Sequence, residues 1–330
     1  MSPGNLNSEQ STASLQPVSP GSADLVLGID GGGSKTTALL ADISGNILGR
    51  GEAGASNFQT LTEDNVRRTL IETVEAAFAD ARLPCQPAAI LGLGLSGVDR
   101  PEDHARVQRW VSEDHLANKA LVGNDSNLLL WAGTLEGWGI AVISGTGSIV
   151  YGRKTDGKTA RAGGWGYRFG DEGSGFAIGT AALRAVAKAA DGRGPQTMLT
   201  TSILHHWNLQ QPPDLISHIY SGLPYPQIAS LAKLVNHIAE QNDPVARSIL
   251  MEAARELVEG IKAVYEKLDF QGNIPAALGG GVLSNSDLVK NEMLRLCAEE
   301  GIPLHPVEMV MQPVLGAVRM AIAALRNQNV

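Results

Sequence analysis

Two copies of one short pattern constrain the fold of this chain most strongly. In each copy a glycine-rich turn joins two apolar runs, and a polar turn then leads to a third run. The first copy starts at Leu25 with LVLGID, GGGSK and TTALLAD, and the second starts at Gly139 with GIAVI, SGTGS and IVYGRK. Apolar runs that alternate with such turns predict three antiparallel strands per copy. The copies lie about 114 residues apart, from Gly31 to Gly145, which is too long for a solenoid repeat and indicates a duplicated domain.

After the first copy, helices alternate with buried strands. Apolar residues at helical spacing predict an amphipathic helix over 62–81. A strand over 88–95, a helix over 101–116 and a strand over 120–123 are expected next, so that Asp125 lies just past the end of a strand. The first lobe is therefore predicted to end as strand, helix, strand.

After the second copy, the pattern is mostly helical. An apolar stripe is clearest over 244–268, within a region over 180–268 that we interpret as a helical insertion. A strand over 276–281, a helix over 286–300 and an amphipathic helix over 313–325 complete the chain. The fold class is therefore α/β.

The chain divides into four parts. We expect a disordered tail over 1–23, an N-terminal lobe over 24–122, a C-terminal lobe over 123–312 with a helical insertion at about 180–270, and a C-terminal helix over 313–328 that packs back on the N-terminal lobe. The tail has neither the apolar middle of a secretory signal nor the arginines of a transit peptide. The late apolar stretch is interrupted by Gln312, Pro313 and Arg319, so it is too short to span a membrane. We expect a cytoplasmic protein without membrane contact.

Composition limits the ligands. The chain has 26 Lys and Arg residues against 34 Asp and Glu, a net charge of −8, and no basic residue before Lys35, which argues against nucleic acid. Glycine makes up 38 of the 330 residues, well above average usage, and indicates backbone brought close to a ligand. Cys85 and Cys297 are the only cysteines, which predicts reduced thiols rather than a disulfide framework.

Two glycine motifs resemble better-known ones, but their surroundings differ from what those motifs require. A Walker A loop needs Gly directly before its Lys and a helix after it, whereas Ser34 precedes Lys35 and a strand-like run follows. A hairpin turn can still bind phosphate, because successive glycine N–H groups form an anion site and Lys35 adds positive charge; an ordinary hairpin is the alternative. The run GLGLSG from Gly92 to Gly97 matches the dinucleotide fingerprint, but Asp125 follows about 28 residues later instead of about 20, which disfavours a Rossmann dehydrogenase.

A third glycine-rich run, GGWGYRFGDEGS, begins at Gly163. Ordering so many glycines costs backbone entropy, so the run predicts contact with a ligand rather than an idle surface loop. Trp165 offers a flat apolar face and Asp171 offers two acceptors, a combination that suits a sugar ring and its hydroxyls.

Together, the motifs GIDGGGSKT, LSGVD, NDS, ISGTGS, GGWGYRFGDEGS, GGGVLSN and PVLGA resemble, in order, those of the N-acetylglucosamine kinase group of the BadF/BadG/BcrA/BcrD ATPase family. The resemblance spans about Leu25 to Leu325. It implies two actin-like (ribonuclease H-like) lobes from a duplicated βββαβα unit, with a helical insertion in the second lobe. It also implies MgATP between the two glycine turns and phosphorylation of N-acetyl-D-glucosamine to its 6-phosphate.

The resemblance also implies roles for individual residues. Asp30 would help hold Mg²⁺ through water, and Asp125 would be the base that deprotonates the sugar hydroxyl. The nucleotide would contact Asp30, Gly31, Gly32, Gly33, Ser34, Lys35, Gly145, Thr146, Gly147, Ser230, Gly279, Gly280, Gly281 and Asn285. The sugar would contact Asn57, Asp125, Ser148, Gly164, Trp165 and Asp171.

General chemistry favours these roles independently. Phosphoryl transfer depends on positioning and charge neutralisation, which a glycine turn from each lobe can supply. A strand-end Asp in a cleft is a rigid place for a general base, and Asp125 suits this better than Asp99 or Asp171. The alternative for Asp125 is that it caps a helix ahead of Leu128 to Trp131.

Other functions stay open. Glucosamine or N-acetylmuramic acid is an alternative substrate, because one pocket contact decides among hexosamines. An activator ATPase that shares an iron–sulfur cluster between subunits is disfavoured, because no cysteine lies between Cys85 and Cys297. A sugar-binding regulatory protein is a third alternative. The expected partner is a small-molecule sugar, and the pattern is compatible with a homodimer.

Overall fold

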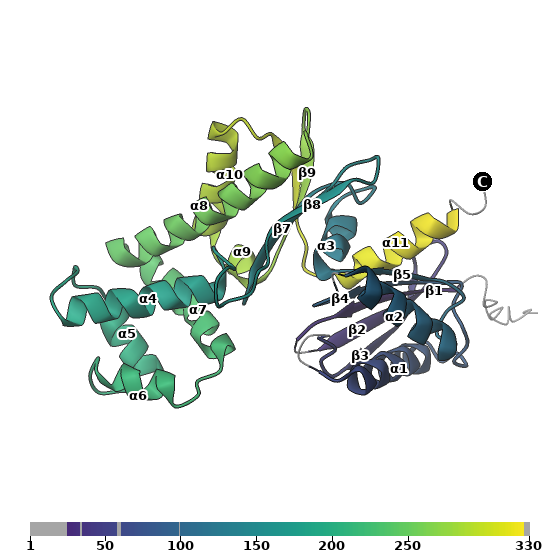
Figure 1. The fold of residues 1–330 in the computed structure, drawn as a ribbon, viewed down its shortest axis with the longest axis horizontal. Coiled ribbons are helices and arrows are strands. Elements are labelled where there is room, and N and C mark those ends of the chain that lie inside the picture. The colour runs from purple at the N-terminus through teal and green to yellow at the C-terminus, as the bar shows by residue number, and fades with distance from the viewer. Residues whose placement is uncertain (1–24, 34, 58–60, 99, 327–330) are drawn as a thin grey trace, which may run out of the picture.

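The computed structural model of the chain describes residues 25–33, 35–57, 61–98 and 100–326. It forms two lobes, each a mixed sheet with helices packed against it (Figure 1). The predicted tail over 1–23, together with Ser34 and Asp99, lies outside the described residues.

Each lobe contains a five-stranded sheet of the same topology. The first sheet consists of β1 (Leu25–Gly31), β2 (Thr36–Asp42), β3 (Ile47–Ala53), β4 (Ile90–Leu95) and β5 (Ala120–Gly123). The second consists of β6 (Gly139–Ser144), β7 (Ser148–Arg153), β8 (Thr159–Gly163), β9 (Ile274–Gly279) and β10 (Leu304–Met309). The strand orders are β3-β2-β1-β4-β5 and β8-β7-β6-β9-β10, so every strand has a counterpart. This order confirms the duplication and the predicted fold class.

The central strand β1 is buried on both faces. Leu27 and Ile29 join one apolar core with α1 (Glu63–Asp80) and α2 (Pro101–Glu113). Val26 joins a second core with α11 (Val314–Arg326) on the opposite face. Successive side chains of a strand point to opposite faces, so one continuous apolar run supplies both cores.

The second lobe carries the helical region. Its helices are α4 (Gly175–Ala190), α5 (Leu199–His206), α6 (Asp214–Tyr220), α7 (Tyr225–Glu240), α8 (Pro244–Lys267), α9 (Gly281–Asn285) and α10 (Asp287–Glu299). Leu257, Ile261 and Val264 of α8 are buried in one core with Ile140 and Val142 of the second sheet. The predicted helical insertion therefore packs directly on the second sheet.

Helix α3 (Asp125–Gly133) links the two lobes. It packs against α11 and against strands of both sheets, including β4, β6 and β9. Glycines allow the close approach: a Cβ at Gly92 would lie 2.2 Å from the Ala317 carbonyl oxygen, and one at Gly94 would lie 2.5 Å from Leu128. These two glycines of the GLGLSG run thus make room for helices.

The Rossmann alternative is wrong, because β2 and β3 pair antiparallel beside β1.

Some boundaries differ from the predicted ones. The strand expected over 276–281 is β9 (Ile274–Gly279), which ends because Gly280 has a φ of 92° and starts the turn into α9. Sequence analysis missed α9 and β10; β10 lies at the edge of its sheet and is only partly buried, so it lacks an apolar run. In the part of the chain that is described, no helix is long and apolar enough to cross a membrane.

The contact between α11 and α3 provides a stability test. A Cβ at Gly316 would lie 1.9 Å from the Leu128 carbonyl oxygen. We therefore expect Gly316→Ala to lower the free energy of unfolding by about 1–3 kcal/mol, measured by urea denaturation, because the helices must move apart. Gly54→Ala is the control, since no heavy atom lies within 4 Å of its Cβ position, and should change stability little. Equal midpoints for the two variants would contradict close packing at Gly316.

Candidate active site

The glycine turn of the second lobe connects β6 to β7. Gly145 N–H donates to the Gly147 carbonyl oxygen at 2.9 Å. The first residues of α4 support the turn: Gly175 N–H donates to the Gly145 carbonyl oxygen at 2.7 Å, and Phe176 N–H donates to that of Thr146 at 3.3 Å. The turn is therefore held in place by the start of α4.

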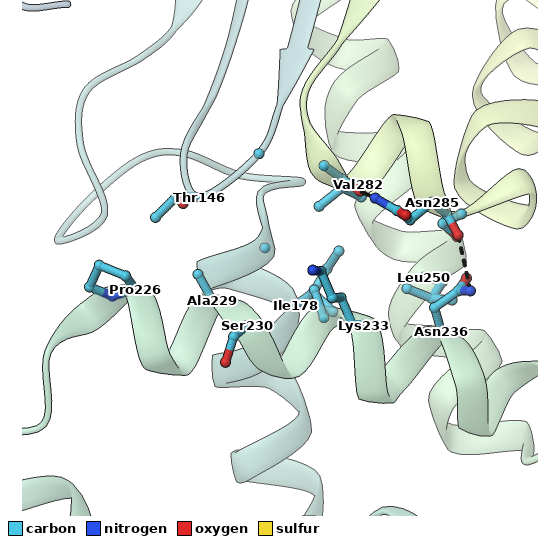
Figure 2. Close-up of a pocket in the computed structure, with 15 residues that line it drawn as sticks. Thr146, Ile178, Pro226, Ala229, Ser230, Lys233, Asn236, Leu250, Val282 and Asn285 are labelled. Atoms are coloured by element: carbon cyan, nitrogen blue, oxygen red, sulfur yellow. Dashed lines mark hydrogen bonds between the residues drawn. The ribbon is translucent and has the colours of Figure 1, made fainter. Parts of the chain in front are cut away.

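A cavity of about 500 Å³ lies beside this turn (Figure 2). Five residues that the sequence assigned to the nucleotide line it: Gly145, Thr146, Ser230, Gly281 and Asn285. Sequence analysis missed the other lining residues, which are Gly175, Ile178, Pro226, Ala229, Ala232, Lys233, Asn236, Leu250, Val282 and Ser286. Most of these residues belong to helices. They were missed because ordinary helical side chains form no recognisable sequence motif.

One end of the cavity is closed by a hydrogen bond from α7 to α9, and a second hydrogen bond lies within α9. Asn236 Nδ2 donates to the Asn285 carbonyl oxygen at 3.2 Å, and Asn285 Nδ2 donates to that of Gly281 at 2.6 Å (Figure 2). Gly280 brings α9 against the glycine turn, since a Cβ there would lie 2.3 Å from the Ser144 carbonyl oxygen. Gly279 and Gly280 therefore allow the backbone to turn tightly from β9 into α9. Gly281, by contrast, lines the cavity.

The glycine turn of the first lobe connects β1 to β2. Gly32 N–H donates to the Lys35 carbonyl oxygen at 3.1 Å, and Ser56 N–H donates to that of Gly32 at 3.0 Å. Asn57 lies beside the turn, with its Nδ2 4.0 Å from a Cβ position at Gly33. Ser34, which the sequence assigned to the phosphates, is not among the described residues.

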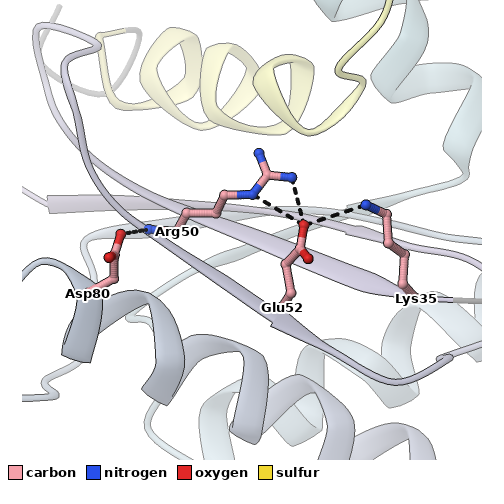
Figure 3. Close-up of polar contacts among 4 residues, drawn as sticks. All are labelled: Lys35, Arg50, Glu52 and Asp80. Carbon is pink, nitrogen blue, oxygen red and sulfur yellow. Dashed lines mark hydrogen bonds and ion pairs between the residues drawn. The ribbon is translucent and has the colours of Figure 1, made fainter.

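Lys35 contacts an acid of its own sheet. Its Nζ lies 3.4 Å from Glu52 Oε1, and Arg50 Nη2 lies 2.7 Å from the same oxygen (Figure 3). Arg50 first, and then Lys35, hold the pKa of Glu52 below its ordinary value. The Lys35 and Glu52 side chains are 62% and 49% exposed, so their ion pair is weak in water and Lys35 can exchange its partner for a phosphate.

Asp125 lies close enough to Asp30, which is near the end of β1, for their negative charges to interact. Burial, and then the negative charge of Asp125, raise the pKa of Asp30 to about 6 against the opposing influence of Lys35. Ser96 connects the elements, because its N–H donates to the Gly31 carbonyl oxygen at 2.8 Å and its Oγ donates to Asp125 Oδ2 at 3.4 Å. Ser96 belongs to the LSGVD motif, but no role was predicted for it from the sequence.

Asp125 is not the cap of α3. The cap is Asn124, whose Oδ1 accepts hydrogen bonds from Asn127 N–H at 3.0 Å and Ser126 Oγ at 2.9 Å. Asp125 is the first helical residue, and its Oδ1 accepts from Ser126 N–H at 2.8 Å. The capping alternative for Asp125 is therefore wrong.

Two of the predicted sugar-binding residues line a cavity between the lobes. Gly164 and Trp165 share this cavity of about 1180 Å³ with Asn124 and with residues of both lobes. Trp165 is 62% exposed, and the Arg161 guanidinium carbon lies 5.5 Å from its ring centre. An exposed aromatic face in a polar cavity can stack on a sugar ring.

Asp171 and Ser148, the next two predicted sugar-binding residues, make hydrogen bonds to the glycine-rich run. Asp171 is 8% exposed with a φ of 58°, and its Oδ1 accepts from Gly166 N–H at 3.1 Å. Its Oδ2 lies 2.6 Å from a Cβ position at Gly147, so the carboxylate packs against the glycine turn. Burial raises the pKa of Asp171, although backbone hydrogen bonds from Gly166 and Ser148 lower it. Ser148 Oγ donates to the Glu172 carbonyl oxygen at 2.6 Å.

The two thiols belong to different lobes. Cys85 is exposed and follows α1, whereas Cys297 is buried in the core of the second lobe. Burial raises the pKa of Cys297 to about 12.

The duplicated sheets and their two glycine turns define an α/β ATPase of the sugar kinase and actin-like class. The sequence model of the BadF/BadG/BcrA/BcrD ATPase family matches residues 27–321, and the chain belongs to this family. The family recognised from the sequence motifs is confirmed.

Relatives of this chain are sugar kinases. It is 37% identical over 298 residues to the N-acetylmuramic acid/N-acetylglucosamine kinase of Clostridium acetobutylicum, with 90% of this chain and 97% of that one covered. It is 32% identical over 317 residues to the N-acetyl-D-glucosamine kinase of Dictyostelium discoideum, with 91% and 98% covered. A solved structure from Chromobacterium violaceum, assigned as an N-acetylglucosamine kinase, has a TM-score of 0.73 and 28% identity, with 92% of this chain and all (100%) of that chain covered.

The hydrogen bonds of Asn124 at the start of α3 can be tested by substitution. We expect Asn124→Ala to lower the free energy of unfolding by about 1 kcal/mol, measured by urea denaturation, because Asn127 N–H loses its acceptor. Asn124→Ser should retain most of the stability, since serine is an equally good cap. If alanine and serine behaved alike, the side chain of Asn124 would not be stabilising the start of α3.

Proposed function

We propose that the protein transfers the γ-phosphoryl group of ATP to an amino sugar, converting N-acetyl-D-glucosamine to its 6-phosphate. The observation that carries the proposal is that Asp125 lies near Asp30 and the first glycine turn, because Ser96 is hydrogen-bonded both to Gly31 and to Asp125. Membership of an ATPase family and the sugar kinase relatives support it. A phosphorylation assay of the purified protein over a panel of hexosamines tests it, and N-acetylglucosamine should react fastest.

The proposed nucleotide position is the cavity beside the second glycine turn. The turn at 145–147 would bind the phosphates through backbone N–H groups, with the turn at 31–35 facing them from the first lobe. The adenosine would lie between α7 and α9, near Ser230, Gly281 and Asn285. The volume of about 500 Å³ is in the range of small-molecule sites.

Mg²⁺ fits the residues at the end of β1. Asp30 offers carboxylate oxygens, and a cation there would offset its repulsion with Asp125. Within the described ranges, no group of three His, Cys, Asp or Glu side chains could hold a metal ion. That is compatible with Mg²⁺, which keeps several waters and shares its ligands with substrate phosphates. We propose that Asp30 holds the ion through water, where it would neutralise phosphate charge.

Asp125 is the proposed general base. Its carboxylate takes the proton of the sugar 6-hydroxyl while that oxygen attacks the γ-phosphorus, the bond from the γ-phosphorus to the bridging oxygen breaks, and ADP leaves. The hydrogen bonds from Ser96 Oγ and Ser126 N–H support this role, because they orient the carboxylate.

The proposed sugar site involves residues of both glycine-rich segments of the second lobe and one residue of the first. Trp165 and Gly164 would form one side of the sugar site, with Asn57, Ser148 and Asp171 shaping it from the adjoining turns. Glucosamine and N-acetylmuramic acid are the alternative substrates that the hexosamine panel separates.

We also propose that the protein works in the cytoplasm and that it forms a homodimer. The proposed boundary between the lobes is at residue 123, with 313–328 returning to the first lobe.

The role of Asp125 is tested by Asp125→Asn. We expect kcat to fall at least ~10²-fold, because the proton acceptor is lost, while the affinity for ADP measured by calorimetry stays the same. Asp64→Asn, at an exposed position in α1, is the matched control and should keep full activity. Near-complete turnover by Asp125→Asn would require another base, and Asp171 would be the first candidate.

Sugar and nucleotide should assist each other's binding. The phosphate-binding turns belong to opposite lobes, so both can grip the nucleotide only when the lobes close, and a sugar that bridges the lobes favours closure. We expect N-acetylglucosamine to tighten a non-hydrolysable ATP analogue by about 1–3 kcal/mol, and the analogue to tighten the sugar by the same factor. Calorimetric titration of each ligand, with and without the other, measures both. Independent affinities would contradict closure.

A further inference from the structure

The wall that α7 contributes to the nucleotide cavity contains a cation. Of the described residues that line this cavity, Lys233 alone has a charged side chain. The others are glycines, apolar residues and neutral Ser, Thr and Asn side chains. Figure 2 shows the Lys233 side chain rising from α7 into the cavity, on the side of Val282. The cavity therefore suits a ligand with one negatively charged part.

Lys233 makes no ion pair with the described part of the chain. The acid of its own helix, Glu240, is otherwise engaged: Asn236 Nδ2 donates to Glu240 Oε1 at 2.9 Å, and His237 Nδ1 lies 3.9 Å from Glu240 Oε2. Lys233 is exposed, and a lysine head group without an acidic partner can donate charge-assisted hydrogen bonds to an anionic ligand without first breaking an ion pair.

The position of Lys233 along the cavity indicates which part of a nucleotide it meets. One end of the cavity is the glycine turn with Thr146, and the opposite end is closed by the bond from Asn236 to Asn285. Helical side chains tilt toward the start of their helix, so Lys233 leans away from Asn236 and toward the end of the cavity that Thr146 lines (Figure 2). Its ammonium group is thus directed to the phosphate side of the cavity.

We propose that the Lys233 ammonium group binds the phosphate chain of the nucleotide and makes the cavity selective for nucleotides over nucleosides. The inference rests on the proposed function, which places ATP in this cavity. It adds a contact from the second lobe that exists without lobe closure. Lys35 of the first lobe, by contrast, is paired with Glu52 and reaches the nucleotide only across the cleft.

The test separates the charge of Lys233 from its alkyl chain. Binding of adenosine, AMP and ADP is measured by calorimetry for the full-length wild type, Lys233→Met and Lys233→Arg. Methionine keeps an apolar chain of similar length and removes the charge, whereas arginine keeps the charge. Lys188→Met is the matched control, because Lys188 is an exposed lysine of the same lobe that does not line the cavity. Thermal midpoints confirm that each variant is folded.

We expect Lys233→Met to weaken ADP binding at least about tenfold and to leave adenosine binding unchanged. Lys233→Arg and Lys188→Met should bind ADP as the wild type does, and added salt should reduce the difference between methionine and lysine. Equal losses for adenosine and ADP would overturn the proposal, because the chain would then act by packing on the nucleoside. Unchanged ADP binding by Lys233→Met would also overturn it, with the proposed function intact. A wild type that binds no nucleotide would refute the proposed function itself, and this inference with it.

Discussion

The position of the candidate active site depends on the close contact of α11 with the first sheet. Glycines make it possible, because Cβ atoms at Gly28 and Gly92 would lie 2.6 Å and 2.2 Å from the α11 backbone. At Gly316, α11 approaches the backbone of α3 equally closely. The start of α3 is thereby held at the end of β1, and Asp125 is brought beside Asp30.

Charge is distributed unevenly around the two glycine turns. Two carboxylates meet at the first turn, and their repulsion is one reason that the pKa of Asp30 is raised to about 6. The cations nearby are held differently: Lys35 pairs with Glu52, and Lys233 extends from α7 into the cavity of the second lobe. The two carboxylates therefore lie at the first lobe's turn, whereas the cation of the cavity wall belongs to the second lobe.

Most of the fold was predictable from local patterns, and the site was predictable in part. The strands around both glycine turns follow from alternating apolar runs and turns, and α8 follows from its apolar stripe. The edge strand β10 was missed because partial burial leaves no periodic signal. Gly145 and Gly281, which line the cavity, were predicted because glycine-rich turns form recognisable motifs. Lys233, in the same lining, was not predicted, because a lysine on a helix looks like any solvated residue.

The duplicated unit, the glycine turns and the helical insertion follow from the order of residues, because period and turn chemistry act between residues that are close in the chain. The folded structure was needed to establish that Asn124 and not Asp125 caps α3, and that Asp171 packs against Gly147. It also decided which side chains surround the cavity between α7 and α9. These arrangements depend on how helices approach two sheets, and no local pattern records the contacts between elements that are distant in sequence.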